Sequence, residues 1–533
     1  KAGIVGRLVA NDFSGALISA ELLEFNPNTG EPLDYIFVAH ELEERIRAQV
    51  KSGNIGVVVD THIIGFAKVI GDIADGTTRV VLFFAAAFLI TGLLVYIYSQ
   101  SIKITVIPLA CSLVAVTWQL GLLTRLGYGI DPMGILVPFL VFAIGVSHGV
   151  QMISAFGAEV FQGTDALTAA RASFRRLLIP GGVALVSDTI GFVTILFIKI
   201  QVIQEMAITA SLGVAAIILT NLVLLPVLLS YLSLGDAYRE KLQKRSRQLA
   251  RMWRVLARVS EPKPAAAVIL IAAGMLMFGI WKAADISIGD LHVGVPELRG
   301  DSRYNIDSAV ISDRFSIGVD VISVIVETIE EGCIDYDVMS TIDRFVWHME
   351  NVDGVQSVVS LSGVAKVINA GWNEGSLKWR VLPRNQSVLV QAVAYVPTSS
   401  GLLNEDCSIM PVIIFTADHK AETIAKIVSE VKSFRQEYGS ETVKFQLATG
   451  NVGVMAATNE VVEAAQFPIL FGVFSAIILL CLITFRSVRA VLCIVIPLGL
   501  VSLLAYALMA VLEIGLKVST LPIVALGVGV GVD

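Results

Sequence analysis

The sequence carries little charge for its length. Of its 533 residues only 16% are Asp, Glu, Lys or Arg, whereas ordinary soluble domains contain about 25%. Hydrophobic residues make up 55% of the chain, and the mean hydropathy is +0.75. The net charge of -7 leaves no basic excess that would attract nucleic acid. These values exclude a disordered chain, a basic nucleic-acid-binding protein and a typical cytosolic enzyme, and they indicate an integral membrane protein with sizeable soluble parts.

Residues that commonly carry catalysis are also few. The five cysteines are too few for a disulfide scaffold, and the six histidines are scattered without the spacing of a zinc site. No G-x-x-x-x-G-K-[ST] loop for ATP is present. The segment GVSHG at 145–149 lies in an apolar stretch, so we interpret it as a membrane motif rather than a nucleophile elbow. We therefore expect no metal, no cofactor and no enzyme activity.

Long apolar stretches are what the sequence has in abundance. About 20 apolar residues form a helix that crosses the hydrocarbon core of a bilayer. Eight stretches approach or exceed this length: Val80–Tyr98, Ile104–Thr124, Met133–Ile153, Ile179–Ile198, Val202–Leu232, Pro264–Trp281, Phe467–Phe485 and Val488–Leu512. A ninth, Val518–Asp533, stops with the sequence before it could cross. The pattern predicts a polytopic α-helical membrane bundle, in which Cys111, Cys481 and Cys493 are small packing residues.

The links between these stretches differ in charge. Links 154–178 and 233–263 are rich in Lys and Arg, and the positive-inside rule places such links in the cytoplasm. The interval 283–465, which holds 25 Asp and Glu against 13 Lys and Arg, then faces outward. We interpret the basic run at 239–258 as an interfacial helix that fixes the topology, with a specific lipid site as the alternative.

The outward interval alternates between strand and helix patterns. Strands are predicted at Val321–Val326, Val355–Leu361, Ser387–Tyr395, Val412–Phe415 and Val443–Leu447, and helices at Val338–Met349 and Lys420–Tyr438. This order is typical of an α+β domain built from ferredoxin-like units. Cys333 and Cys407 both belong to this interval; the sequence leaves their pairing open, because it does not give their separation.

The first 78 residues resemble the end of a similar unit. Segments Ile4–Ala10 and Ala16–Phe25 predict a hairpin, and Ile36–Lys51 predicts a helix. A strand at Ile55–Val59 follows, and a helix from about Ile63 leads into the first apolar stretch.

The chain repeats itself at a shift of 384–389 residues. The segment VIPL at 106–109 recurs at 495–498, and HIIG at 62–65 has its counterpart in NVGV at 451–454. Each half is thus a soluble unit followed by membrane stretches, which predicts two parallel repeats of the kind found in transporters.

Four segments carry a resemblance to a known family: PFLVFAIGVSHGVQMI at 138–153, LVSDTIGFVTILFI at 185–198, IQEMAITASLGVAAIILTNLVLLPVLLSYL at 203–232 and LPIVALGVGVGVD at 521–533. The chain resembles the resistance–nodulation–division (RND) superfamily in its MMPL branch of exporters, and spans two to six of that superfamily also resemble a sterol-sensing domain. The family has twelve spans, so the resemblance implies a fragment without span one, spans eleven and twelve, and half of the first periplasmic domain.

The resemblance implies a division of the chain into six parts. Residues 1–78 would be the C-terminal part of the first periplasmic domain, 79–232 spans two to six, 233–263 a basic cytoplasmic linker, 264–282 span seven, 283–465 the second periplasmic domain, and 466–533 spans eight to ten with the last one truncated.

Three ionisable residues in the apolar stretches are candidate proton carriers, because a charge in hydrocarbon is costly and is kept for function. Asp533 matches an acid of the family's proton relay. His148 stands one residue before the position that matches Asp533, where many relatives have an acid and this chain has Gly149. Asp188 lies between Ser187 and Thr189, and it is expected to face the two helices that carry His148 and Asp533.

Each candidate also has a structural interpretation. Asp533 could be an acid near the cytoplasmic face, His148 a neutral hydrogen-bonded side chain, and Asp188 an acid capped by neighbouring hydroxyl groups. Small residues that allow close helix packing are expected at Gly145, Gly149, Gly527, Gly529 and Gly531.

The resemblance implies a proton-driven exporter of hydrophobic or lipid-like molecules in the bacterial inner membrane, with large periplasmic domains. Its expected partners are the lipid bilayer, protons and that substrate, and homo-oligomerisation is left open. The alternatives are a lipid- or sterol-sensing membrane protein without transport and an accessory subunit of protein export. A pure sensor needs no titratable group in its bundle, which is the feature that separates these functions.

Overall fold

The computed structural model divides into two compact units. The sheet unit comprises Lys1–Asp75 and Gly289–Asn459, and the membrane unit comprises Gly76–Ile288 and Glu460–Asp533. The structure describes residues 4–20, 22–27, 29–52, 59–131, 134–232, 238, 240, 244, 250, 252–521, 527–528 and 531.

Eight helices among the described residues are long and apolar enough to cross a membrane. They are α3 (Phe66–Ser99), α4 (Ile102–Arg125), η2 and α5 (Gly134–Phe161), α6 (Ala166–Ile195), α7 with η3 and α8 (Gln201–Ser230), α10 (Pro262–Ala283), α16 (Asn451–Phe485) and α17 (Val488–Val511). Every predicted complete span overlaps one of them, so the prediction of a polytopic helical membrane protein is confirmed. The predicted ninth stretch, Val518–Asp533, lies largely outside the described residues.

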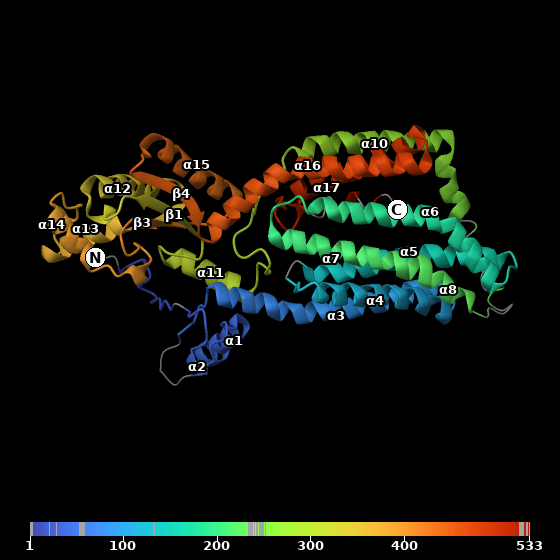
Figure 1. The fold of residues 1–533 in the computed structure, drawn as a ribbon, viewed down its shortest axis with the longest axis horizontal. Helices are drawn as coiled ribbons and strands as arrows, with labels where there is room; N and C mark the ends of the chain where they lie inside the picture. Colours follow the sequence, from blue (N-terminus) through green and yellow to red (C-terminus); the bar gives the residue numbers. More distant parts are fainter. Residues whose placement is uncertain are drawn as a thin grey trace. The chain divides into compact units, whose positions relative to one another are not determined.

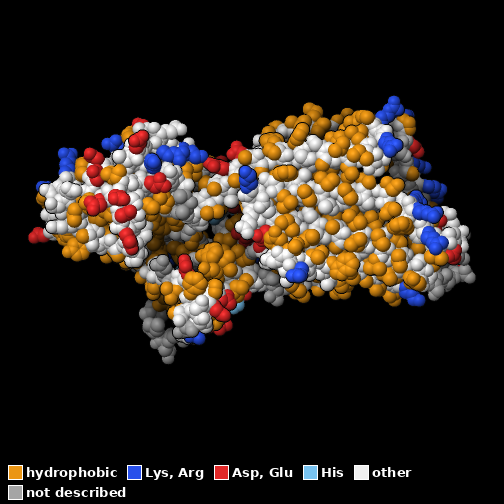
Figure 2. Space-filling model, viewed as in Figure 1, with side chains coloured by type: hydrophobic (Ala, Val, Ile, Leu, Met, Phe, Trp, Pro, Cys, Tyr) orange, Lys and Arg blue, Asp and Glu red, His pale blue; other side chains and the backbone are white. Residues whose placement is uncertain are grey.

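Within the membrane unit, α4, α5, α6 and α7 pack against one another, and α10 packs along α17 (Figure 1). The largest side chains buried in this unit include Phe156, Leu185 and Phe192. The outer surface of the membrane unit is also apolar. Ile269, Leu270 and other large side chains of α10 are exposed. Figure 2 shows hydrophobic side chains spread over this unit, which is the surface that a lipid-facing helix presents.

The sheet unit contains four strands, β1 (Val321–Thr328), β2 (Val355–Val359), β3 (Ile409–Thr416) and β4 (Val443–Thr449). They form one antiparallel sheet in the order β2-β3-β1-β4. Side chains alternate along β1 and β3, so that every second residue enters the core. The strand predictions at these four places are confirmed.

Helices α12 (Tyr336–Glu350) and α15 (Ala421–Tyr438) pack against each other and against the sheet. Each has its apolar residues on one face, as the predictions for 338–349 and 420–438 required. Phe345 of α12, Phe434 of α15 and Phe445 of β4 meet with ring centroids 4.8–5.3 Å apart. This aromatic contact joins both helices to the sheet.

Phe345→Ala is expected to destabilise the sheet unit by about 3–5 kcal/mol, because the removed ring leaves a cavity in a packed core. Phe345 has no exposed surface, whereas Trp347, two residues along the same helix, is 67% exposed. Trp347→Ala is therefore the matched control and should leave stability unchanged. Hydrogen exchange of the β1 and β4 peptides in the full-length protein measures the difference; equal exchange in the two variants would contradict this packing.

One predicted strand is wrong. Ser387–Tyr395 is not a strand but lies in the helix α14 (Gln386–Ala394), which Asn385 caps by accepting a hydrogen bond from the Val388 N–H. Its buried residues, Leu389, Ala392 and Val393, follow helical spacing and face the neighbouring helix α13 (Leu361–Trp372). Tertiary packing therefore overrode the strand propensity of the valines.

Helices α13 and α14 lie in an insertion between β2 and β3, and a disulfide closes its far end. Cys407, just before β3, is bonded to Cys333, which follows β1, with the two Cα atoms 5.5 Å apart. The pairing that the sequence left open is thus present in the structure.

Within the sheet unit, the N-terminal segment packs against α11 (Arg303–Arg314). Ala10 is buried with Ile311 and Phe315 in a small apolar cluster. A continuous helical stretch, α1 (Tyr35–Glu41), η1 (Leu42–Arg47) and α2 (Ala48–Ser52), confirms the predicted helix. The predicted hairpin is reduced to isolated bridges such as Val9 with Ala16, and the predicted strand lies almost wholly outside the described residues.

Candidate functional site

Two of the three predicted proton carriers lie inside the membrane unit. His148 is on α5 and Asp188 is on α6, and their exposed fractions are 4% and 1%. Asp188 is therefore enclosed by protein and does not face lipid. Asp533, the third candidate, lies outside the described residues, as does Gly529.

The position of His148 follows from the glycine opposite it. A Cβ atom built on Gly181 of α6 would lie 4.0 Å from the His148 Nδ1, so the imidazole faces α6 at Gly181. Asp188 is seven residues further along α6, which is two turns and about 10 Å on the same face of an α-helix. The imidazole of His148 thus faces the side of α6 that also carries Asp188, about two helical turns away.

A third buried polar residue, Asn221, joins three helices. Asn221 is fully buried in η3, a π-helical turn between α7 and α8. Its amide donates to the Gly145 carbonyl of α5 and lies 3.4 Å from the Ser112 hydroxyl of α4. Such π-turns are frequent at functional sites, since they re-aim a side chain within an otherwise regular helix.

Other polar groups are buried in the same unit. The Gln119 Nε2 donates to the Thr209 carbonyl at 3.0 Å, which ties α4 to α7. Four oxygen atoms, on Gln119, Ser187, Thr220 and Asn221, are buried and make no hydrogen bond within the described residues. The interior of the membrane unit therefore contains several polar groups within its apolar core.

Several predicted packing glycines are in close contact. A Cβ on Gly149 would lie 2.7 Å from the Pro108 Cβ, and one on Gly531 would lie 2.5 Å from a methyl carbon of Leu498. Gly527 differs, because nothing would lie within 4 Å of its Cβ.

Gly145→Ala is expected to destabilise the membrane unit by about 1–3 kcal/mol, the usual cost of overpacking. The new Cβ would lie 2.8 Å from the Ser112 hydroxyl oxygen and 3.0 Å from the Asn221 amide nitrogen, so it would push apart the contact that joins three helices. Gly157→Ala on the same helix is the control, since nothing lies within 4 Å of its Cβ. Thermal denaturation in detergent, followed by size-exclusion chromatography, should show a lower melting temperature for Gly145→Ala alone; two equal values would be the contrary result.

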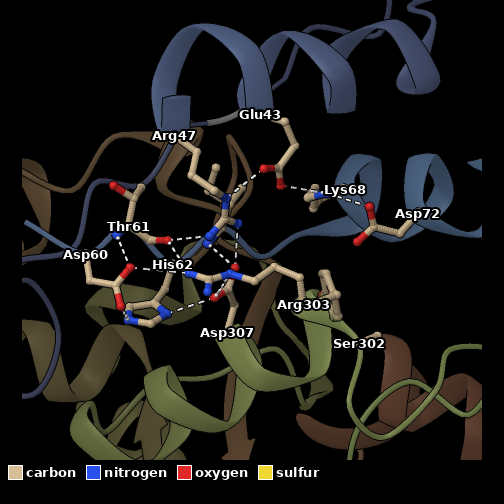
Figure 3. Close-up of polar contacts among 12 residues, drawn as sticks. Glu43, Arg47, Asp60, Thr61, His62, Lys68, Asp72, Ser302, Arg303 and Asp307 are labelled. Atoms are coloured by element: carbon tan, nitrogen blue, oxygen red, sulfur yellow. Dashed lines mark hydrogen bonds and ion pairs between the residues drawn. The ribbon is translucent and has the colours of Figure 1, made fainter. Parts of the chain in front are cut away.

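The sheet unit holds a second polar cluster, centred on Asp307 of α11 (Figure 3). The Asp307 carboxylate has no exposed side-chain surface and accepts from Arg47, from the His62 Nδ1 at 2.8 Å and from the Ile63 N–H at 3.1 Å. The Arg303 Nε lies 3.0 Å from the same carboxylate. Four donors thus converge on one buried acid.

This cluster ties α11 to the segment that leads into α3. Arg47 also donates to the Glu43 carboxylate at 2.7 Å, and Glu43 in turn lies 2.8 Å from the Lys68 ammonium group at the start of α3. Burial alone would raise the pKa of Asp307, but the hydrogen bonds from Arg47, Ile63 and His62 outweigh it and hold that pKa below its ordinary value. The carboxylate is therefore charged and acts as a structural clamp.

Sequence reasoning did not find Asp307. Its partners Arg47 and His62 lie 260 and 245 positions away along the chain, and Asp307 stands in a polar segment where an acid is unremarkable in sequence. The segment HIIG at 62–65, which contains His62, stands out in the sequence only as part of the repeat. Among the described residues no group of three or more His, Cys, Asp or Glu is placed to hold a metal ion.

Known proteins are similar to this chain in sequence over part of its length and in fold over most of it. Residues 39–267 match the family model described as the MMPL family. No curated protein matches the sequence. The fold is similar to a solved structure of the hedgehog release protein Disp from the water bear Hypsibius dujardini, with a TM-score of 0.57 and 13% sequence identity.

That structural match covers 91% of this chain and 64% of the Disp chain, so this chain spans less than two thirds of the protein that it resembles. At 13% identity the likeness concerns the fold. The family model covers α3 to α8, the helices that hold His148, Asp188 and Asn221. The chain is therefore a polytopic membrane protein in which residues 39–267 are similar to the MMPL family and the fold is similar to that of Disp.

Proposed function

We propose that the protein is a proton-driven exporter of hydrophobic or lipid-like molecules in a bacterial inner membrane, with the sheet unit in the periplasm. The observation that carries this proposal is the burial of Asp188, which is 1% exposed in the middle of an apolar helix. An acid in such a place is costly unless it serves a function, and reversible protonation is a function that only a titratable group provides.

Protonation of the buried groups would change the packing of the helices that hold them. We assign the role of proton carrier to Asp188 on α6, to His148 on α5 and to Asp533. Neutralising a buried acid removes a charge from a region of low dielectric constant and so alters which helix arrangement is favoured. The driving energy would come from inward proton movement, at about 2.3 kcal/mol for each charge that crosses 100 mV.

The rest of the architecture supports a transporter. The helix pair α3 and α4 has 34 and 24 residues, and α16 and α17 have 35 and 24, with a proline inside α4 and inside α17. We propose that these pairs are equivalent parts of two parallel repeats, a transporter design in which the pathway runs between the repeats.

The sheet unit supports the same proposal. Without its insertion, its order is β1-α12-β2-β3-α15-β4, with the strands arranged β2-β3-β1-β4. We propose that it is a ferredoxin-like domain, for which this element order is characteristic. Such a domain would receive the substrate outside the membrane. The Disp protein with the similar fold is described as a release protein, and release of a cargo is also what an exporter performs.

The proposal is tested with the full-length protein in proteoliposomes that contain a fluorescent lipid-like probe. Probe movement should follow an imposed pH gradient, and a protonophore should stop it. Movement that is the same with and without the gradient would contradict proton coupling. Specific binding of a lipid or sterol without any gradient-dependent movement would favour the sensor instead.

A further inference from the structure

The insertion between β2 and β3 differs in charge from the rest of the sheet unit. Between Gly375 and Asn404 the sequence contains no Asp or Glu, although the surrounding interval is strongly acidic. The same stretch contains the basic residues Lys378, Arg380 and Arg384. The stretch 375–404 of the insertion is therefore a local positive region on an acidic domain.

Large apolar side chains are exposed at the same place. Leu377 is 79% exposed and Tyr395 is 75% exposed, and Trp372 and Trp379 also present about half of their surface to solvent. We call these four residues together with Lys378 and Arg380 the aromatic–basic surface. Exposed apolar residues in such a concentration are unusual on a soluble domain and mark an interaction site.

The fold gathers these residues around the C-terminal end of α13. The Asn369 side chain of α13 donates to the carbonyl groups of Trp379 and Val381, which fixes the segment 377–381 beside this helix. The ring of Trp372, the last residue of α13, meets the Tyr395 ring at 6.0 Å. Residues that are distant in sequence are thus presented together.

The exposure and the composition of the aromatic–basic surface indicate what kind of partner it binds. A pocket for a single small molecule encloses its lining residues, whereas Leu377 and Tyr395 are almost fully exposed. Trp and Tyr combined with Lys and Arg is the composition of segments that lie in the interface of a bilayer, where the aromatic rings enter the headgroup layer and the cations meet anionic lipids. We propose that the aromatic–basic surface binds the surface of a bilayer that contains anionic lipid.

This binding does not depend on the proposed export. It also does not use the Asp307 cluster or the buried groups of the membrane unit. The cations Lys378 and Arg380 of the aromatic–basic surface are complementary to anionic headgroups. Near such a membrane surface each Lys or Arg strengthens binding about fivefold.

The test uses full-length protein in nanodiscs of neutral lipid, mixed with vesicles of phosphatidylcholine alone or with phosphatidylglycerol added, and measures co-flotation. The wild type should bind the anionic vesicles. The variant Lys378→Gln/Arg380→Gln should bind about 25-fold more weakly, since it lacks two cations. The variant Leu377→Ser/Trp379→Ser/Tyr395→Ser should lose at least tenfold, because it lacks the apolar contact.

Trp347→Ala is the matched control: Trp347 is 67% exposed in the same unit but lies on α12, outside the aromatic–basic surface, and its variant should bind as the wild type does. The basic link 233–263 is also expected to attract anionic vesicles. The test therefore compares the binding of the wild type with that of the two variants in the aromatic–basic surface. Unchanged binding in both surface variants would overturn the proposal. So would a wild type that binds no vesicles but forms a dimer that the same variants abolish, because the surface would then bind protein.

Discussion

Asp188→Asn is expected to reduce gradient-driven movement of a lipid-like probe by at least tenfold in proteoliposomes of the full-length protein. The amide has the size of the carboxylic acid but does not take up and release a proton. Because Asp188 is 1% exposed, the substitution changes no surface that a substrate or a lipid would meet from outside the bundle. The amide also keeps hydrogen-bonding capacity at this position, so the variant should still fold.

Glu205→Gln is the matched control for this experiment. Glu205 also belongs to a membrane helix, α7, but lies near its start, where its carboxylate accepts a hydrogen bond from Gln201 at 2.8 Å in an exposed position. Its loss should leave movement of the probe unchanged. Equal activity in the wild type and in Asp188→Asn would remove Asp188 from the proposed mechanism, whereas equal losses in the two variants would indicate a general effect of removing acids.

Asp307→Asn is expected to open the clamp between α11 and the N-terminal segment. Arg47 and Arg303 would lose the negative charge that both face, at a cost of about 2–3 kcal/mol, which is below that of a fully buried pair since Arg303 is about half exposed. Hydrogen exchange in peptides from α11 and from residues 35–52 should become about 30- to 100-fold faster. Asp301→Asn is the control, since Asp301 pairs with Arg299 at an exposed site and should have no measurable effect.

The same clamp predicts a dependence on pH. The pKa of Asp307 is lowered in the folded protein, so its contribution to stability is complete above the unfolded value of about 4 and is lost as the pH falls through the folded value. The difference in exchange between the wild type and Asp307→Asn should therefore be constant near neutral pH and shrink below about pH 4. A difference that grew on acidification would contradict a charged carboxylate at this place.

The membrane helices could be predicted from the sequence because the length of an apolar run is a local property. The same holds for Asp188 and His148, since an ionisable residue stands out within such a run. Their distance from each other could not be predicted: it depends on how α5 and α6 pack, and the contact of His148 with Gly181 is visible only in the structure.

Contacts between distant segments account for what the sequence did not show. Asp307 gathers Arg47 and His62 across about half of the chain, and no pattern near any of the three residues indicates this. The pairing of Cys333 with Cys407 likewise required the fold, because 74 residues separate them. The helix α14 was mistaken for a strand, since its valines favour a strand and only the packing on α13 makes it helical.

Proton flux measures directly whether Asp188 carries protons. The full-length protein is reconstituted with a pH-sensitive dye inside the vesicles, and the wild type, Asp188→Asn and Asp533→Asn are compared under one imposed pH gradient. We expect rapid acidification of the vesicles for the wild type and a proton flux at least tenfold lower in both variants. Equal flux in all three proteins would contradict proton transport by these acids and would leave a polytopic membrane protein in which they have a structural role.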